Sequence, residues 1–281
     1  METVEKSKSR LDELERMKQM EIDGEFDKDT GIDPPTIELK PEMIDYLKKK
    51  PINAIKNKIA NFLMKKGVKN FIKNNQLLIK EVIGAEKLNS VKYGAIITCN
   101  HFNPFDNFAV EYAFNSSKKK RKRLWKVIRE GNYTNPPCFN FFFRNCNVLP
   151  LSSNAETMKN FMKAVKVVLE KKKHSILVYP EQGMWWNYRK PRPLKQGAFR
   201  FAVNSNVPVV PMFITMQDSD IIDPEGFPMQ EYTVHVFDPI YPDPNLDKKA
   251  NINMMMEKNY QLWCDTYEKV YGEKVVYNTK K

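Results

Sequence analysis

From about residue 85 onward, short apolar runs alternate with segments in which apolar residues recur every three or four positions. The short runs are typical of buried strands, and the periodic segments are typical of amphipathic helices. Strands are predicted near residues 95–99, 125–129, 147–151, 175–179, 208–215 and 232–237. Helices are predicted near residues 105–115, 154–172, 196–204 and 247–271. This alternation predicts an α/β fold, in which helices flank a sheet.

The segment 154–172 carries the clearest helix signals. Ser153 and Glu156 have the spacing of a capping box, in which each side chain bonds to the other residue's backbone N–H. Lysines at residues 171–173 suit the negative end of the helix dipole. The apolar stripe between these ends consists of Met158, Phe161, Met162, Val165, Val168 and Leu169.

The first 84 residues differ in composition from the rest. Residues 2–21 are densely charged and have only a thin apolar stripe, which predicts a short helix that is exposed or depends on a partner. Residues 22–40 contain Asp23-Gly24 and Asp33-Pro34-Pro35, which are typical of turns and linkers. We therefore expect a charged extension and linker over 1–40, a basic amphipathic helical segment over 41–84, and one α/β domain over 85–281.

Residues 41–80 combine many lysines with apolar residues at helical spacing. Either the apolar stripe packs on the rest of the protein, or it lies in a membrane interface. In the second interpretation Phe62, Leu63 and Phe71 insert, while Lys56 and Lys66 contact anionic headgroups, each lysine contributing about 1 kcal/mol. Nucleic acid is a poorer match, because the aromatic residues fall on the apolar stripe and do not alternate with the charges as stacking platforms do.

Composition narrows the partners and the compartment. The net charge of +12 indicates an anionic partner, and the basic run Lys118 to Arg123 would add to a membrane-facing field if it lies on the same side as residues 41–80. The four cysteines form no C-x-x-C pair and have no metal-like spacing with the histidines, so neither a metal site nor a disulfide framework is predicted. No apolar run is long enough to span a bilayer. We expect a cytoplasmic protein that lies peripherally on the inner face of the membrane.

The predicted strand 95–99 leads into Asn100-His101-Phe102-Asn103-Pro104-Phe105-Asp106. In open α/β sheets the ligand crevice lies at the carboxyl ends of the strands. A histidine there can take a proton near neutral pH, and a carboxylate on its other ring nitrogen would fix the tautomer and stabilise the imidazolium. His101 is therefore a candidate base and Asp106 its partner. From these residues alone, a loop histidine that only hydrogen bonds locally stays an alternative.

A second strand end is predicted at Tyr179-Pro180-Glu181. The loop that follows contains Trp185 and Trp186 and then four cations at residues 189, 190, 192 and 195. Tryptophans in a basic loop indicate a pocket lining or a membrane interface. The cations are candidates for binding phosphate. The alternative is that Glu181 joins an ion pair or caps a helix and that the cations are solvated.

Four blocks together resemble the lysophospholipid acyltransferase family, which includes bacterial 1-acyl-glycerol-3-phosphate acyltransferases. The blocks are Asn100-His101-x-x-x-x-Asp106, Tyr179-Pro180-Glu181, Leu194-Lys195-Gln196-Gly197-Ala198 and Val207-Pro208-Val209-Val210-Pro211. They occur in the family's order and spacing and cover roughly residues 85–215. The resemblance implies a mixed sheet flanked by helices, as in glycerolphosphate acyltransferases.

The resemblance also implies roles. His101, oriented by Asp106, is the expected general base that takes the proton of a glycerol hydroxyl as it attacks an acyl thioester. The expected substrate-binding residues are Glu181, Gly183, Arg189, Arg192 and Lys195. Among them Glu181 would fix the acceptor, the Gln182-Gly183 amides would face the oxyanion, and the cations would hold a phosphate. No metal or other cofactor is expected, because the donor is a thioester of coenzyme A or acyl carrier protein.

Two positions depart from the family. Ser153 stands where the second block normally ends in an arginine, and Arg144 lies nine residues earlier. The Glu-Gly-Thr-Arg of the third block becomes Glu181-Gln182-Gly183-Met184, which removes another arginine. Arg189 and Arg192 are candidate replacements, and a different acceptor headgroup stays open.

Two other functions stay open beside transfer. A hydrolase could use the pair His101 and Asp106 on an ester or thioester, although the blocks contain no Gly-x-Ser-x-Gly elbow and no evident nucleophile. A non-catalytic module that binds anionic lipid or nucleic acid needs no such pair, but it leaves the four ordered blocks unexplained. The leading prediction is transfer to a lysophospholipid, most simply 1-acyl-glycerol-3-phosphate, at an anionic membrane surface and without a nucleic-acid partner.

Overall fold

The computed structural model describes residues 5–31, 36–117, 123–136 and 139–280. Its strands are β1 (Leu78–Ile83), β2 (Ile96–Thr98), β3 (Leu124–Ile128), β4 (Val148–Pro150), β5 (Ser175–Val178), β6 (Val209–Ile222) and β7 (Pro228–Val236). Within the described ranges these strands form one sheet in the order β1-β7-β6-β2-β5-β3-β4. Among these described strands β6 and β7 pair antiparallel, and the other neighbours are parallel. The predicted mixed sheet is confirmed.

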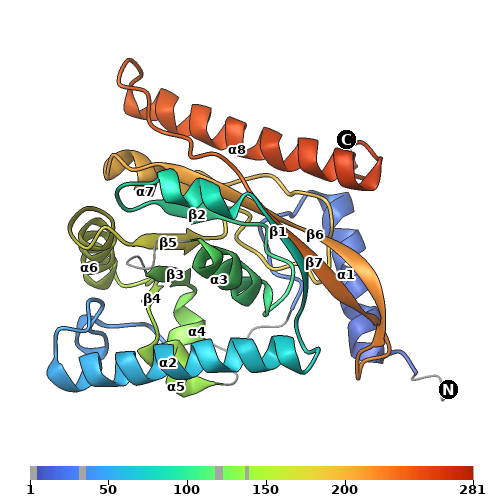
Figure 1. Ribbon diagram of the computed structural model, residues 1–281, viewed down its shortest axis with the longest axis horizontal. Coiled ribbons are helices and arrows are strands. Elements are labelled where there is room, and N and C mark those ends of the chain that lie inside the picture. Colours follow the sequence, from blue (N-terminus) through green and yellow to red (C-terminus); the bar gives the residue numbers. More distant parts are fainter. Residues whose placement is uncertain (1–4, 32–35, 118–122, 137–138, 281) are drawn as a thin grey trace.

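Helices cover both faces of this sheet (Figure 1). They are α1 (Lys8–Asp23), α2 (Pro51–Lys73), α3 (Asp106–Ser116), α4 (Glu130–Thr134), α5 (Asn140–Asn145), α6 (Ala155–Lys166), α7 (Gly197–Asn204) and α8 (Lys248–Tyr271). Short 3₁₀ turns lie at Pro41–Met43 and Ala85–Ser90, and a π-helical turn at Val167–Lys171 continues α6. In Figure 1, α2 and α8 lie on opposite sides of the sheet.

The central strands are buried on both faces, which explains why their sequences read as continuous apolar runs. Ile97 of β2 and Leu177 of β5 belong to the core cluster that also contains residues of α2 and α3. Ile96 and Ile176 point to the other cluster, with residues of α6, α7 and α8. Because neighbouring strand residues face opposite sides, two helical layers each receive half of every central strand.

The start of α6 differs from the prediction. Its N-cap is Asn154, whose side chain accepts hydrogen bonds from the backbone N–H groups of Glu156 and Thr157. The Ser153 N–H instead donates to the carboxylate of Glu130. The predicted capping box is therefore wrong, although the predicted helix is present as α6.

Helix α2 packs part of its apolar surface on the protein and leaves another part exposed. Ala60 and Val68 are buried, and Phe71 packs against Phe105, which precedes α3, and Phe108 of α3, with ring centroids 5.7 and 5.9 Å apart. The insertion predicted for Phe71 is therefore wrong. Apolar side chains that remain exposed on α2 are Ile52, Ile55, Ile59, Phe62 and Leu63.

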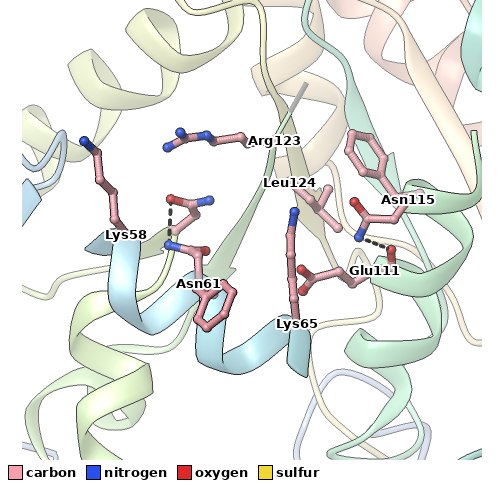
Figure 2. Close-up of a pocket in the computed structure, with 10 residues that line it drawn as sticks. Lys58, Asn61, Lys65, Glu111, Asn115, Arg123 and Leu124 are labelled. Carbon is pink, nitrogen blue, oxygen red and sulfur yellow. Dashed lines mark hydrogen bonds between the residues drawn. The ribbon is translucent and has the colours of Figure 1, made fainter. Parts of the chain in front are cut away.

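A cavity of about 260 Å³ lies between α2, α3 and the segments where β3 and β4 begin (Figure 2). Arg123 is one of its lining residues, whereas the rest of the predicted basic run, residues 118–122, lies outside the described residues. A search of the described helices for one with the length and apolar character of a membrane span finds none.

The segment after α8 returns to the N-terminal region. The backbone N–H of Lys280 donates to the carbonyl of Ile22 at 2.9 Å, and that of Asn278 donates to the Glu21 carboxylate at 3.0 Å. The Tyr277 hydroxyl donates to the carbonyl of Pro191, in the loop after β5. Residues 276–280, the C-terminal tail, therefore join α1 to this loop.

Candidate active site

The register of β2 and β5 brings two sequence blocks together. Thr98, the last residue of β2, pairs with Val178, the last residue of β5. The strands are parallel, so the chain leaves the sheet at the same edge in both cases, and His101 and Glu181 follow at equal distances along the chain. Asn100 fixes the first exit further, because its side-chain amide exchanges two hydrogen bonds with the backbone of Ile214 on β6.

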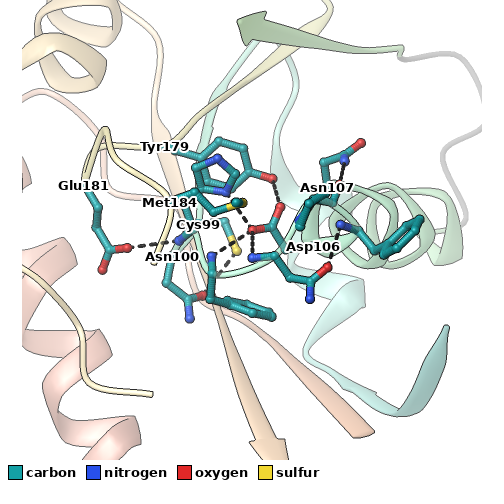
Figure 3. A network of polar contacts seen from close by, with 12 residues as sticks. Cys99, Asn100, Asp106, Asn107, Tyr179, Glu181 and Met184 are labelled. Atoms are coloured by element: carbon teal, nitrogen blue, oxygen red, sulfur yellow. Dashed lines mark hydrogen bonds and ion pairs between the residues drawn. The ribbon is translucent and has the colours of Figure 1, made fainter. Parts of the chain in front are cut away.

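Asp106 holds the His101 ring from one side (Figure 3). Its Oδ2 lies 2.7 Å from His101 Nδ1 and also accepts the backbone N–H groups of Phe102 at 3.0 Å and Asn103 at 3.2 Å. Asp106 is fully buried at the N-terminus of α3, where the helix dipole favours a negative charge. An ionised carboxylate only accepts hydrogen bonds, so Nδ1 carries the proton and Nε2 keeps its lone pair.

Tyr179 completes the environment of the pair. Its hydroxyl donates to Asp106 Oδ1 at 2.6 Å, and its ring stacks on the His101 ring with centroids 4.0 Å apart. Burial and the nearby negative charge of Asp106 raise the pKa of Tyr179 well above its usual range, so the hydroxyl stays protonated. The imidazole is thus fixed by a hydrogen bond at one edge and a ring on one face. Its side chain remains 23% exposed, and Nε2 has no bonded partner among the described residues.

Glu181 and Arg192 form a buried ion pair behind the His101 loop. Each is 1% exposed, and Glu181 Oε2 lies 2.8 Å from Arg192 Nη2. The Glu181 carboxylate also accepts the N–H groups of His101 at 2.9 Å and Arg192 at 2.7 Å. The Arg192 guanidinium donates to the carbonyls of His101, Gly183 and Phe26. The contacts of this pair are with the protein backbone, and they set the position of His101.

The other predicted phosphate ligands are also paired with acids. Arg189 lies 2.6 Å from Asp218, and Lys195 lies 2.7 Å from Asp27. Both ion pairs are at the surface, in contrast to that of Arg192. Arg189 and Lys195 are therefore partly exposed to solvent, as the alternative interpretation of the sequence allowed, and each is also paired with an acid.

The predicted oxyanion donors have other partners. The Gly183 N–H donates to the Glu181 carbonyl at 3.0 Å, and the Gln182 N–H donates to the Tyr179 carbonyl at 3.2 Å. Both amides are used within the turn. In this conformation the turn offers neither of them to a substrate, which corrects the assignment made by analogy with the family.

Residues 26–30, the N-terminal strap, pack against the same loop. The Trp185 indole donates to the Lys28 carbonyl at 2.8 Å, and the Met184 N–H donates to Asp29 Oδ1 at 2.6 Å. Asp29 also pairs with Arg129. A Cβ on Gly183 would lie 2.1 Å from the Lys28 carbonyl oxygen, so only glycine permits this approach. For these residues the predicted linker is wrong, because they are packed on the candidate site.

The predicted membrane-contact residues share one region of α2. Lys56, Phe62, Leu63 and Lys66 are all exposed, and Phe62 is 68% exposed. The C-terminal part of this helix reaches the His101 loop through the contact of Phe71 with Phe105. The helix that carries these exposed apolar side chains is therefore also packed, at its other end, against the His101 loop.

Sequence reasoning missed the Tyr179 hydroxyl, the strap and the role of Asn100. The one local signal was Tyr179 itself, which stands in one of the four blocks that carry the family resemblance. No group of His, Cys, Asp and Glu that could hold a metal occurs in the part of the chain that the structure describes. Cys99, Cys146 and Cys264 are free, and Cys138 lies outside the described residues.

Comparison with known proteins agrees with this geometry. Residues 80–215 match the family described as Acyltransferase. The fold is similar to the crystal structure of the 1-acyl-sn-glycerophosphate (LPA) acyltransferase PlsC from Thermotoga maritima, with a TM-score of 0.52 and 17% sequence identity over 78% of this chain and 84% of that one. No curated protein matches the sequence.

Proposed function

We propose that this chain, whose residues 80–215 match the family described as Acyltransferase, moves a fatty acyl group from a thioester to a free hydroxyl of a lysophospholipid, with His101 as general base. The observation that carries the proposal is the contact of 2.7 Å between His101 Nδ1 and Asp106. That contact leaves Nε2 as the ring atom that accepts a proton.

The reaction needs one proton transfer in each direction. Nε2 takes the proton of the acceptor hydroxyl while its oxygen attacks the thioester carbonyl carbon. The carbon–oxygen bond forms, the carbon–sulfur bond breaks, and the thiolate takes the proton back from the imidazolium. Asp106 stabilises the imidazolium between these steps, and Tyr179 keeps the ring in position. Such general base catalysis contributes about 10²- to 10⁴-fold to the rate.

We propose 1-acyl-glycerol-3-phosphate as the first acceptor to test. Its phosphate needs a cation, and surface ion pairs such as Arg189–Asp218 and Lys195–Asp27 contribute only about 0.2–1 kcal/mol. A doubly charged phosphate can therefore displace either carboxylate. Arg192 is buried with Glu181, and its role in this proposal is to position His101. The donor is a thioester of coenzyme A or acyl carrier protein.

The proposed location is the cytoplasmic, anionic face of a membrane, where a lysophospholipid is presented. The exposed apolar side chains of α2 and the adjacent Lys56 and Lys66 support a peripheral contact. Each lysine near an anionic leaflet contributes about 1 kcal/mol, so several hold the protein without a spanning helix.

The test is transfer from an acyl-coenzyme A to a panel of lysolipids that differ in headgroup, with His101→Ala beside the wild type. The substitution should lower transfer by about 10²- to 10⁴-fold, while the melting temperature and vesicle binding are retained. Unchanged transfer would exclude His101 as the base, and it is the result expected of a non-catalytic lipid-binding module. Product analysis separates the remaining rival, because free fatty acid without diacyl lipid means hydrolysis.

A further inference from the structure

The cavity between α2 and α3 lies away from His101. Helix α3 begins at Asp106, beside the catalytic loop, and the cavity is lined by its later residues Glu111, Phe114 and Asn115. The strands contribute Arg123 and Leu124 where β3 begins and Asn147 just before β4. In the parallel part of the sheet these are the amino ends of the strands. His101 follows a carboxyl end, so the two sites lie at opposite edges.

Three cations surround the opening of this cavity. Lys58 and Lys65 extend from α2 toward the start of β3, where Arg123 lies (Figure 2). All three are exposed, and none of them forms an ion pair with a residue that the structure describes. Among the described lining residues the one carboxylate, Glu111, is already 2.8 Å from Lys126. The cavity therefore carries an excess of positive charge, unlike the loop after β5, whose cations are paired.

The floor of the cavity is formed by buried residues, Phe114, Leu124 and Asn147. Its volume of about 260 Å³ falls just below the range of about 300–1,000 Å³ typical of sites for drug-sized ligands. Cations at the rim and a side-chain amide below them match a compact anion such as a phosphate ester, since charge-assisted hydrogen bonds to phosphate are strong.

The rim continues into the exposed apolar surface of α2. Phe62 lines the cavity and is 68% exposed. Ile55 and Ile59 lie seven and three residues before it, so all three share a helix face, and both isoleucines are about half exposed. A soluble anion leaves these side chains in water, and single-stranded nucleic acid is bound on aromatic platforms among the charges. A phospholipid surface places phosphate and apolar chains next to each other, as this face requires.

We infer that this cavity binds the phosphate of an anionic glycerophospholipid that is not a substrate, while Phe62 and its apolar neighbours enter the bilayer. The bound lipid anchors the middle of α2, and the C-terminal part of the helix contacts Phe105, near His101, through Phe71. One headgroup thereby orients the catalytic edge relative to the membrane. This role is independent of the transfer proposed above, and it applies equally to a protein that transfers nothing.

The test compares two pairs of substitutions on the same helix. Lys58→Gln with Lys65→Gln removes two cavity cations, and Lys56→Gln with Lys66→Gln removes two exposed cations outside the cavity. The probe is vesicles of phosphatidylcholine that contain phosphatidylglycerol. The control pair should weaken binding by up to about 30-fold, at about 1 kcal/mol for each lysine. The cavity pair should weaken it at least about tenfold more, because it also loses direct hydrogen bonds to phosphate.

Equal losses for the two pairs would overturn the inference, because the general charge of α2 would then account for binding. A second measurement follows the acetylation of individual lysines by mass spectrometry. Vesicles with phosphatidylglycerol should slow the acetylation of Lys58 and Lys65. If inorganic phosphate alone protects these lysines and vesicles do not, the cavity serves a soluble phosphate and the lipid is wrong. A single-stranded RNA whose binding depends on Lys58 and Lys65, with vesicle binding unaffected, would contradict it as well.

Discussion

The role of Glu181 that the family resemblance implies differs from the role that its contacts in the structure support. The resemblance makes Glu181 an acceptor-binding residue, whereas its carboxylate is buried and bonded to Arg192 and to the His101 backbone. Glu181→Gln keeps the shape of the side chain and removes its charge. The substitution therefore tests whether that charge acts on the acceptor or on the protein.

The expected cost follows from burial. Removing one partner of a buried ion pair leaves the other charge uncompensated and costs about 3–5 kcal/mol. The free energy of unfolding of a folded protein is usually about 5–15 kcal/mol. The Glu181→Gln variant should therefore still fold, but it should unfold at a much lower urea concentration than the wild type. Arg192→Met on the Glu181→Gln background should recover part of the loss, because the uncompensated guanidinium is then gone. The surface pair gives the control: Arg189→Gln should change stability by about 1 kcal/mol or less.

The assays are urea unfolding and the KM for the lysophospholipid, measured under conditions in which the variant is folded. We expect a large loss of stability, a lower kcat because the His101 loop shifts, and little change in KM. The reasoning is refuted if Glu181→Gln unfolds like the wild type and raises KM, since the carboxylate would then act on the acceptor.

Two further predictions concern the strap and the far end of the sheet. Gly183→Ala should displace the strap, lower the free energy of unfolding by about 1–3 kcal/mol and speed the proteolysis of residues 26–30. Gly197→Ala is the control, because there is open space around Gly197 and the substitution should not destabilise the protein. Equal urea midpoints for the two variants would contradict this prediction. Burial lowers the pKa of His235 from 6.5 to about 4, so between these values the unfolded chain binds a proton that the folded chain does not. The free energy of unfolding should therefore fall by up to about 3 kcal/mol as the pH drops from 6.5 to 4, and His235→Asn should show a shallower fall; an unchanged slope would contradict the assignment.

The strand ends and the His101–Asp106 contact could be predicted from sequence because both depend on local signals. A parallel strand buried on two faces gives a continuous apolar run, as in 175–178, and the polar residue after such a run lies at the sheet edge. The strand register then brings the two polar segments together, because Thr98 and Val178 are paired at the ends of neighbouring strands.

The strap could not be predicted because its contacts are distant in sequence. Asp29 accepts a hydrogen bond from Met184, which is 155 positions away in the sequence, and no periodic pattern in either segment predicts this contact. Whether Arg192 would face a substrate or Glu181 was equally undetermined, because a cation next to a loop glutamate suits both. Edge strand β1 was missed since Lys80 and Glu81 interrupt its apolar residues, as is usual for an exposed edge.

The contacts of the C-terminal tail with the site can form only late in the synthesis of the chain. The loop that carries Arg192 is made well before Tyr277 and Lys280, which join it to α1. At about 5–20 residues per second, the intervening stretch takes the ribosome roughly 5 to 20 seconds. Throughout that interval a nascent chain has His101 and Asp106 but lacks the hydrogen bond from Tyr277 to the loop behind them, so this contact forms only after residue 277 has been translated.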